Sequence, residues 1–270
     1  MKRKGSELKK MARASLSGRY AKAIGAILIY LLIGFGINLL TTFFMGRVSN
    51  IPLTYDATYY MKTMLPILGM DIIVSILLQI FLCGLYKFFL NFTRQTEYKI
   101  SDLFYGFTHN PDRIIVANIV QFALYFIVIL PAIMIMTLSI INPNYILLGL
   151  LMMFIDIGLI IMLSYRYLLS PFLLMDNENM GGIESLRISA QLMKGHKGRM
   201  FLISLSFIGW EILTIFTLGI GQLWLLPYIT ITTVFFYMER IGELDPPTPE
   251  PDIEIPDFDT TYYTDNDYHA

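Results

Sequence analysis

Three acidic side chains, Asp71, Asp156 and Glu211, lie inside long apolar stretches of the sequence. An ionised acid at the centre of a bilayer costs about 2.5 to 3.5 kcal/mol, so each needs a reason to be there. We expect Asp156 and Glu211, both near a midplane, to form a protonatable pair that lines a cavity for a proton, cation or polar substrate. Asp71, close to the outer interface, can simply reach water.

The alternative is that each acid is protonated or hydrogen-bonded and only holds helices together, at about 0.6 kcal/mol per bond. Polar residues in neighbouring stretches are the candidate partners for such bonds: Asn38, Gln79, Asn118, Gln121 and Thr214. The sequence leaves both interpretations open.

Motifs for other chemistry are missing from the sequence. It contains no H-E-x-x-H, G-x-S-x-G or P-loop pattern, and His109, His196 and His269 are too far apart for metal-ligand spacing. The only cysteine is Cys83. We therefore expect no catalytic residues, no metal, no cofactor and no enzymatic activity.

One basic cluster stands out, formed by Lys194, His196, Lys197 and Arg199. We expect it to face the cytoplasmic leaflet and to bind anionic lipid headgroups, because each Lys or Arg near such a surface contributes about 1 kcal/mol. The simpler interpretation is the ordinary excess of positive charge on the cytoplasmic side of membrane proteins, which needs no recognition role.

The composition indicates the elements that must position these residues. The chain has 270 residues, of which 55% are hydrophobic and only 15% charged, and its mean hydropathy is +0.58. A soluble domain carries about 25% charged residues. The composition thus excludes a soluble enzyme, a coiled-coil rod and a disulfide scaffold, and it predicts an all-α polytopic membrane protein without a nucleic-acid partner.

Six transmembrane helices are predicted from apolar runs of about 20 residues. Two cover residues 23–46 and 64–90. The uncharged run between Arg113 and Asp156 is too long for one span and folds back at Ile141-Asn142-Pro143-Asn144, where proline and asparagine favour a turn. A last block, residues 200–238, is divided by Gly219-Ile220-Gly221 into spans five and six.

The charges indicate orientation. Residues 1–238 hold 19 basic and 11 acidic residues, a net +8, whereas residues 239–270 hold one basic and ten acidic residues, a net −9. Because 18 of the 20 Lys and Arg residues fall on one side of the predicted spans, both termini should be cytoplasmic, in the cell membrane. Residues 241–270 should be a disordered, acidic, proline-rich tail that engages a cytoplasmic protein partner.

Amphipathic segments precede the spans and predict a threefold repeat. Each segment ends in an apolar residue, any residue and a glycine, which permits a left-handed turn into the bilayer: Leu16-Ser17-Gly18, Phe104-Tyr105-Gly106 and Met193-Lys194-Gly195. The predicted units are residues 6–92, 101–170 and 183–240, each a short interfacial helix followed by a hairpin, within a membrane domain of residues 1–240. The alternative is six helices joined by ordinary basic loops.

The C-terminal third carries five ordered blocks: SAQLMKGHKGR at 189–199, LSFIGW at 205–210, GIGQLW at 219–224, PY at 227–228 and FY at 236–237. This string resembles the bacterial integral membrane family catalogued as domain of unknown function 975, found mainly in Gram-positive Firmicutes. The resemblance implies a multi-pass membrane protein over roughly residues 8–240, and it supplies no catalytic role.

Four residues of these blocks also have a direct interpretation as helix-packing residues. Gly209 predicts a close helix contact beside the large anchor Trp210, and Pro227 followed by Tyr228 should interrupt the sixth span.

The sequence leaves the function open. A non-enzymatic membrane scaffold or accessory protein is the first hypothesis, and a small transporter or channel that uses Asp156 and Glu211 is the alternative. An intramembrane enzyme has the least support, because no nucleophile and base pair is visible.

Overall fold

The computed structural model describes residues 3–48 and 57–245, and the regular structure of this part of the chain is entirely helical. The helices are α1 (Gly5–Leu16), α2 (Tyr20–Val48), α3 (Ala57–Arg94), η1 (Ile100–Phe104), α4 (Tyr105–Thr108), α5 (Pro111–Ile141), η2 (Pro143–Tyr145), α6 (Ile146–Tyr167), α7 (Ser170–Asp176), α8 (Gly182–Leu192), α9 (Lys197–Leu205), α10 (Ile208–Phe216) and α11 (Gln222–Arg240). The predicted all-α fold class is confirmed.

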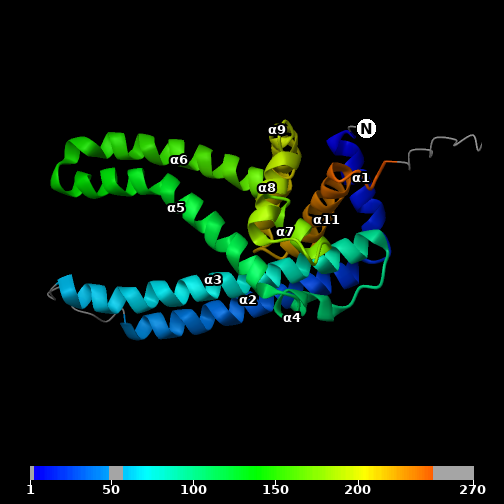
Figure 1. The fold of residues 1–270 in the computed structure, drawn as a ribbon, viewed down its shortest axis with the longest axis horizontal. Coiled ribbons are helices and arrows are strands. Elements are labelled where there is room, and N and C mark those ends of the chain that lie inside the picture. Colours follow the sequence, from blue (N-terminus) through cyan, green and yellow to red (C-terminus); the bar gives the residue numbers. More distant parts are fainter. Residues whose placement is uncertain (1–2, 49–56, 246–270) are drawn as a thin grey trace, which may run out of the picture.

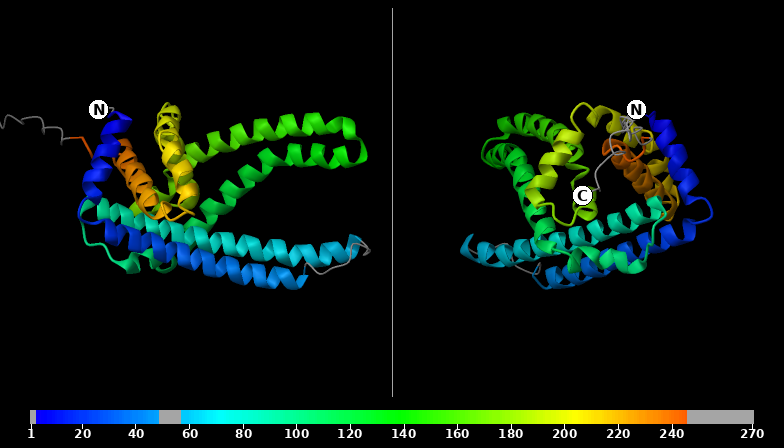
Figure 2. Two further views of the ribbon diagram at one scale, coloured as in Figure 1. Left: turned by 180° about the vertical axis from the view of Figure 1, so that it is seen from behind. Right: turned by 45° about the vertical axis from the view of Figure 1, so that its right-hand side comes forward.

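Two long pairs of helices form arms that project from one end of the molecule, α2 with α3 and α5 with α6 (Figure 1, Figure 2). The second arm reverses at the predicted break, where α5 ends at Ile141 and the side chain of Asn142 accepts a hydrogen bond of 3.1 Å from the Asn144 amide. Bulky apolar side chains along the arms are more than half exposed, among them Leu32, Phe35, Leu39, Ile127, Ile140 and Phe154. Such a surface suits lipid rather than water.

Five stretches of the described residues are long and apolar enough to cross a bilayer: Tyr20–Phe43, Leu65–Arg94, Pro111–Ile141, Pro143–Asp176 and Lys197–Phe216. They follow the first five predicted spans in order. The sixth predicted span corresponds to α11, which has 19 residues but is not one of the five. Its threonines and Gln222 lower its hydropathy, and it buries Ile231–Glu239 in the protein.

The other end of the molecule is a compact base, formed by α1, η1, α4, α7, α8, α9, α11 and the adjoining ends of α2, α3, α5 and α6 (Figure 1). Its core consists of almost fully buried side chains: Leu8, Leu16, Phe88, Phe89, Phe92, Leu103, Phe172, Val234, Phe236 and Tyr237. The apolar face of α1 therefore packs on protein rather than lying open to lipid. In α8 the predicted apolar face is buried only in part, because Ile183 is 55% exposed.

Glycines hold helices of the base at close range. A Cβ atom on Gly84 of α3 would lie 2.0 Å from the carbonyl oxygen of Leu103 in η1, and one on Gly182 would lie 2.4 Å from the carbonyl oxygen of Arg113. Gly18 and Gly195 adopt the predicted left-handed conformation, with φ of 72° and 74°. For Gly106 the prediction is wrong: it lies within α4 and lets this helix approach α3 at Ile80.

A break between α6 and α7 turns the chain into the base. Pro171 lies in the first turn of α7, where its ring prevents α6 from continuing unbroken. The break frees backbone groups, and Ser189 of α8 satisfies two of them: its hydroxyl accepts a bond from the Leu169 amide at 3.2 Å and donates to the Arg166 carbonyl at 3.0 Å. The serine thereby fixes α8 against the kink.

Candidate functional site

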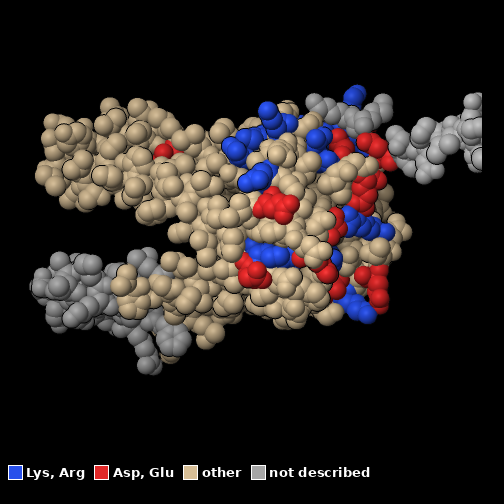
Figure 3. Space-filling model, viewed as in Figure 1, with Lys and Arg blue, Asp and Glu red and all other residues tan. Residues whose placement is uncertain are grey.

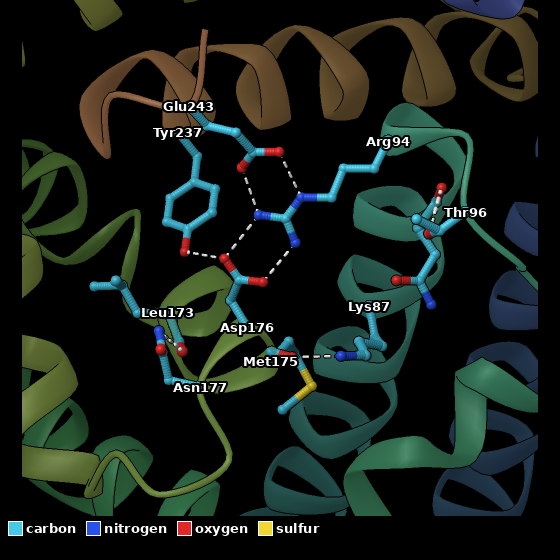
Figure 4. Close-up of polar contacts among 10 residues, drawn as sticks. Lys87, Arg94, Thr96, Leu173, Met175, Asp176, Asn177, Tyr237 and Glu243 are labelled. Atoms are coloured by element: carbon cyan, nitrogen blue, oxygen red, sulfur yellow. Dashed lines mark hydrogen bonds and ion pairs between the residues drawn. The ribbon is translucent and has the colours of Figure 1, made fainter. Parts of the chain in front are cut away.

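Charged side chains gather on the base, whereas the arms show almost none (Figure 3). Some of these charges are neutralised by ion pairs inside the protein. Only the remaining charges are available to a ligand. One internal network is a polar junction of Arg94, Asp176, Tyr237 and Glu243 (Figure 4).

In the polar junction, the Arg94 guanidinium lies between two carboxylates. Its Nη2 donates to Asp176 Oδ2 at 2.9 Å and its Nε donates to Glu243 Oε1 at 2.8 Å, while the Tyr237 hydroxyl also donates to Asp176 Oδ2 at 2.8 Å. Arg94 ends α3, Asp176 ends α7 and Glu243 follows α11, so the junction ties together the ends of three helices. We assign it a structural role.

The polar junction also corrects the predicted start of the tail at residue 241. Glu243 is bound to Arg94, and the Leu244 carbonyl accepts a hydrogen bond of 2.5 Å from Arg3. The first residues of the expected tail thus belong to the folded base. Residues 246–270 lie outside the described part of the chain, so the prediction for them stays a prediction.

The predicted basic cluster is divided by the structure. Arg199 donates from Nη1 to Oε1 of Glu239 at 2.8 Å, and its guanidinium lies 5.1 Å from the centre of the Phe236 ring. Because Glu239 is only 5% exposed, this is a buried ion pair, and Arg199 does not face lipid as predicted. His196 is half-buried in the turn between α8 and α9.

Lys194 and Lys197, unlike Arg199, line a cavity of about 660 Å³, which we call the basic cavity. Arg166 from the last turn of α6 and Arg187 from α8 lie in the same wall. The left-handed turn at Gly195 folds the chain so that both lysines reach one cavity. The remaining lining is Val120, Tyr167, Ile183, Leu186, Ala190 and Gln191, which adds no carboxylate.

The basic cavity is the candidate functional site because its four cations are partly or fully exposed and form no ion pair with a carboxylate of the described residues. Its chemistry is that of an anion receptor, with two guanidinium groups and two ammonium groups over an apolar floor. The sequence alone identified Lys194 and Lys197. It missed Arg166 and Arg187, which come from different helices and carry no local signal.

The predicted intramembrane acids are not brought together. Asp156 is 8% exposed in a cavity of about 590 Å³ whose lining comes from α5 and α6, and its Oδ2 has no hydrogen-bond partner among the described residues. Glu211 of α10 instead accepts a hydrogen bond of 2.5 Å from Gln222 of α11. Asp71 is exposed on α3. The expected Asp156 and Glu211 pair is therefore two separate sites.

The four predicted helix-packing residues have different surroundings, and only some of them pack against other helices. Gly209 is exposed and a Cβ atom there would meet nothing within 4 Å, so the expected close contact is wrong. Trp210 is 60% exposed. Pro227 is buried within α11, which continues past it, and the Tyr228 ring packs edge-on against Phe207 at 5.1 Å.

Comparisons with known proteins place the chain in a family without assigning a reaction to the basic cavity. No curated protein matches the chain, and no solved structure does. One family profile matches residues 1–243, an extent that includes the Glu243 carboxylate of the polar junction. The chain therefore belongs to the family described as Protein of unknown function (DUF975).

Proposed function

We propose that this protein is a six-span protein of the bacterial cell membrane that acts as a non-enzymatic scaffold or accessory protein by binding anionic lipid headgroups at its base. In this proposal both termini and the charged face of the base lie at the cytoplasmic leaflet, and the α9–α10 segment and α11 enter the bilayer. The support is the segregation of charge onto the base and the apolar arm helices α2, α3, α5 and α6 that lead away from it (Figure 1, Figure 3). The sixth span is α11, shielded from lipid over half its length by the base.

The proposal includes the threefold arrangement. Each unit is a short helix followed by two longer apolar segments: α1 before α2 and α3, η1 and α4 before α5 and α6, and α8 before the α9–α10 segment and α11. The ends of the three units meet at the polar junction. A scaffold of this kind presents one continuous charged surface at the cytoplasmic leaflet.

The basic cavity is the single observation that carries the function. Four cations converge without a carboxylate, and such a group of like charges is stabilised when an anion occupies it. Phosphate groups are the anions most abundant at the inner surface of a membrane, and the Ile183 and Leu186 side chains in the floor suit the apolar part of a lipid. We therefore assign phosphatidylglycerol-like headgroups to this cavity.

The test measures lipid affinity of the purified protein in detergent. We expect phosphatidylglycerol to raise the thermal unfolding temperature more than phosphatidylcholine, because a ligand that binds only the folded state stabilises it. In the double variant Lys194→Gln/Lys197→Gln at low salt, the affinity for phosphatidylglycerol should fall about thirtyfold, since each Lys or Arg contributes about 1 kcal/mol.

A matched control removes the same charge elsewhere. Lys10 and Lys99 are exposed on the base and do not line the basic cavity, so Lys10→Gln/Lys99→Gln should retain nearly the native affinity. If the control loses as much affinity as the cavity variant, only general surface charge is involved and the cavity has no role. If neither variant changes the affinity, the proposed function is wrong.

A transporter or channel is the second candidate, and one observation favours it. The Asp156 carboxyl is buried in the apolar arm, and its Oδ2 has no hydrogen-bond partner among the described residues. It lies beside a cavity of about 590 Å³, which is the surrounding expected of an acid that binds a proton or a polar substrate. Because Asp156 and Glu211 lie apart, such a pathway would use Asp156 alone. A flux measurement on Asp156→Asn separates it from the scaffold.

A further inference from the structure

A second hollow lies where the base meets α10, separate from the basic cavity. It has a volume of about 470 Å³ and is formed by α1, the start of α2, the α9–α10 segment and the start of α11. We call it the aromatic groove, and its lining is Lys9, Arg13, Tyr20, Phe207, Trp210, Leu213, Thr214, Thr217, Gly221, Trp224, Leu225 and Tyr228. The groove shares no residue with the basic cavity.

The wall of the aromatic groove is mainly apolar and rich in rings. The chain has two tryptophans, and both line it. Trp210 is 60% exposed and Trp224 53% exposed, so two of the largest side chains are left uncovered on one surface. From Phe207 to Thr217 the wall follows α10, whose rise of 1.5 Å per residue makes this stretch about 15 Å long. Half of a hydrocarbon core of about 30 Å is the same length.

Two cations mark one side of the groove. The Lys9 ammonium lies 4.4 Å from the centre of the Phe207 ring, and the Arg13 Nε donates a hydrogen bond of 3.2 Å to the Tyr228 hydroxyl. Neither forms an ion pair with a carboxylate of the described residues, and the lining contains no acid. Partial burial, together with the neighbouring charge of Arg13, lowers the pKa of Lys9. An anion between the two side chains would favour the charged form of Lys9 and so oppose both causes of its lowered pKa.

We propose that the aromatic groove binds one anionic phospholipid, with its phosphate between Lys9 and Arg13 and an acyl chain along Trp210, Leu213 and Trp224. Charge complementarity selects the anion, and the match between the wall and one leaflet selects a lipid chain over a small soluble phosphate. The aromatic rings offer a flat apolar bed to that chain. This site differs from the basic cavity in having two cations rather than four and in having both tryptophans in its wall.

The two tryptophans provide the readout, because all the tryptophan fluorescence of the chain comes from the groove wall. The protein is placed in nanodiscs that contain the same fraction of either phosphatidylglycerol or phosphatidylcholine with brominated acyl chains, which quench tryptophan on contact. Lipid that merely surrounds the protein quenches equally in both cases. We expect the brominated phosphatidylglycerol to quench at least about twofold more, because one such lipid is held in the groove.

The variant Lys9→Gln/Arg13→Gln should lose this preference and show equal quenching by the two lipids. Lys10→Gln serves as the matched control, since Lys10 is an exposed residue of the same helix outside the groove lining, and it should keep the preference. Far-ultraviolet circular dichroism and the elution volume verify that each variant is folded. Lys194→Gln/Lys197→Gln should also keep the preference, which separates this test from that of the basic cavity.

Three results would overturn the proposal. Equal quenching by the two lipids in the native protein would show that no anionic lipid is selected. A preference that survives Lys9→Gln/Arg13→Gln would place the lipid elsewhere. Equal quenching together with a dimer that dissociates on Trp210→Ala would assign the groove to a second copy of the chain.

Discussion

The base and the arms consist of equally helical chain, yet different forces hold them. In the base, side chains such as Phe89 and Leu103 are completely buried, and partly or largely buried ion pairs join helices far apart in the sequence. Along the arms, large apolar side chains are exposed, and the two helices of each arm pack on one another, α2 with α3 and α5 with α6. The base is packed like a soluble core, whereas the arms depend on a surrounding apolar medium.

This difference shows which part of the chain is held in a single arrangement by specific contacts. Close backbone approach at Gly84 and Gly182 and the polar junction fix one arrangement of the base, because either feature tolerates little displacement. In the described part of the arms, Gly36 and Gly158 have open space around them, and a Cβ atom on Gly149 would lie 2.5 Å from the flexible Met136 side chain rather than from backbone. Anion recognition in both proposals accordingly relies on side chains of the base.

A single methyl group added at Gly84 should distinguish the tight packing of the base from the looser packing of the arms. Gly84→Ala places a Cβ atom 2.0 Å from the backbone oxygen of Leu103, which cannot move without displacing η1. We expect a loss of about 3 kcal/mol or more in the free energy of unfolding. The measurement is chemical unfolding of the purified protein in detergent, followed by circular dichroism.

Gly158→Ala in α6 is the matched control, because nothing lies within 4 Å of its new methyl group. There the substitution should leave stability unchanged or raise it by up to about 1 kcal/mol, since alanine is the better helix former. A control that destabilises as much as Gly84→Ala would mean that arms and base are packed alike.

The second prediction concerns charge. Arg94→Gln leaves Asp176 and Glu243 without their common partner, and the Arg94 and Asp176 side chains are 23% and 18% exposed. We expect a loss of about 2 kcal/mol, because removing one side of a partly buried ion pair leaves the other side uncompensated. Thermal unfolding measured with a thiol-independent dye in detergent gives the shift.

Lys99→Gln removes an ion pair of the same type at the surface, where Lys99 and Glu97 are 64% and 79% exposed. Its thermal unfolding should hardly differ from that of the native protein, because exposed pairs contribute little. Equal shifts for the two variants would show that the polar junction is only a surface feature.

The features that the sequence predicted well depend on short stretches of neighbouring residues. The apolar runs predicted the first five spans, and proline, asparagine and glycine marked the turns at Asn142 and Gly219, because hydropathy and backbone preference act over a few residues. Gly18 and Gly195 belong to the same class. These features require no knowledge of what a residue touches.

Contacts between distant segments explain what the sequence missed. Arg94 and Asp176 are 82 positions apart, and nothing near either residue indicates the other. Gly84 and Gly209 both look like packing glycines in apolar helices, but only Gly84 meets another backbone. In the same way, Arg199 looked like a member of the basic cluster until Glu239 was found beside it. Pairing, rather than residue type, decides which charges stay available to a ligand.

Asp156 allows a test of the arms by a single polar substitution. Its carboxyl is nine-tenths buried without a partner for Oδ2, so Asp156→Asn removes a group that the described residues do not stabilise. We expect the free energy of unfolding to rise by less than about 1 kcal/mol, in contrast to the loss expected for Arg94→Gln in the base. Thermal unfolding in detergent gives this value, and the affinity for phosphatidylglycerol should stay native because Asp156 is in an arm.

Proton flux into proteoliposomes that contain either the native protein or Asp156→Asn distinguishes a scaffold from a transporter or channel. Under the scaffold proposal the two preparations leak equally. If the native protein shows a proton flux that disappears in Asp156→Asn while folding is unchanged, the α5–α6 arm conducts protons and the Asp156 carboxyl is its proton-binding group. Glu211→Gln is the matched variant, because Glu211 already accepts a hydrogen bond from Gln222 and should leave such a flux intact.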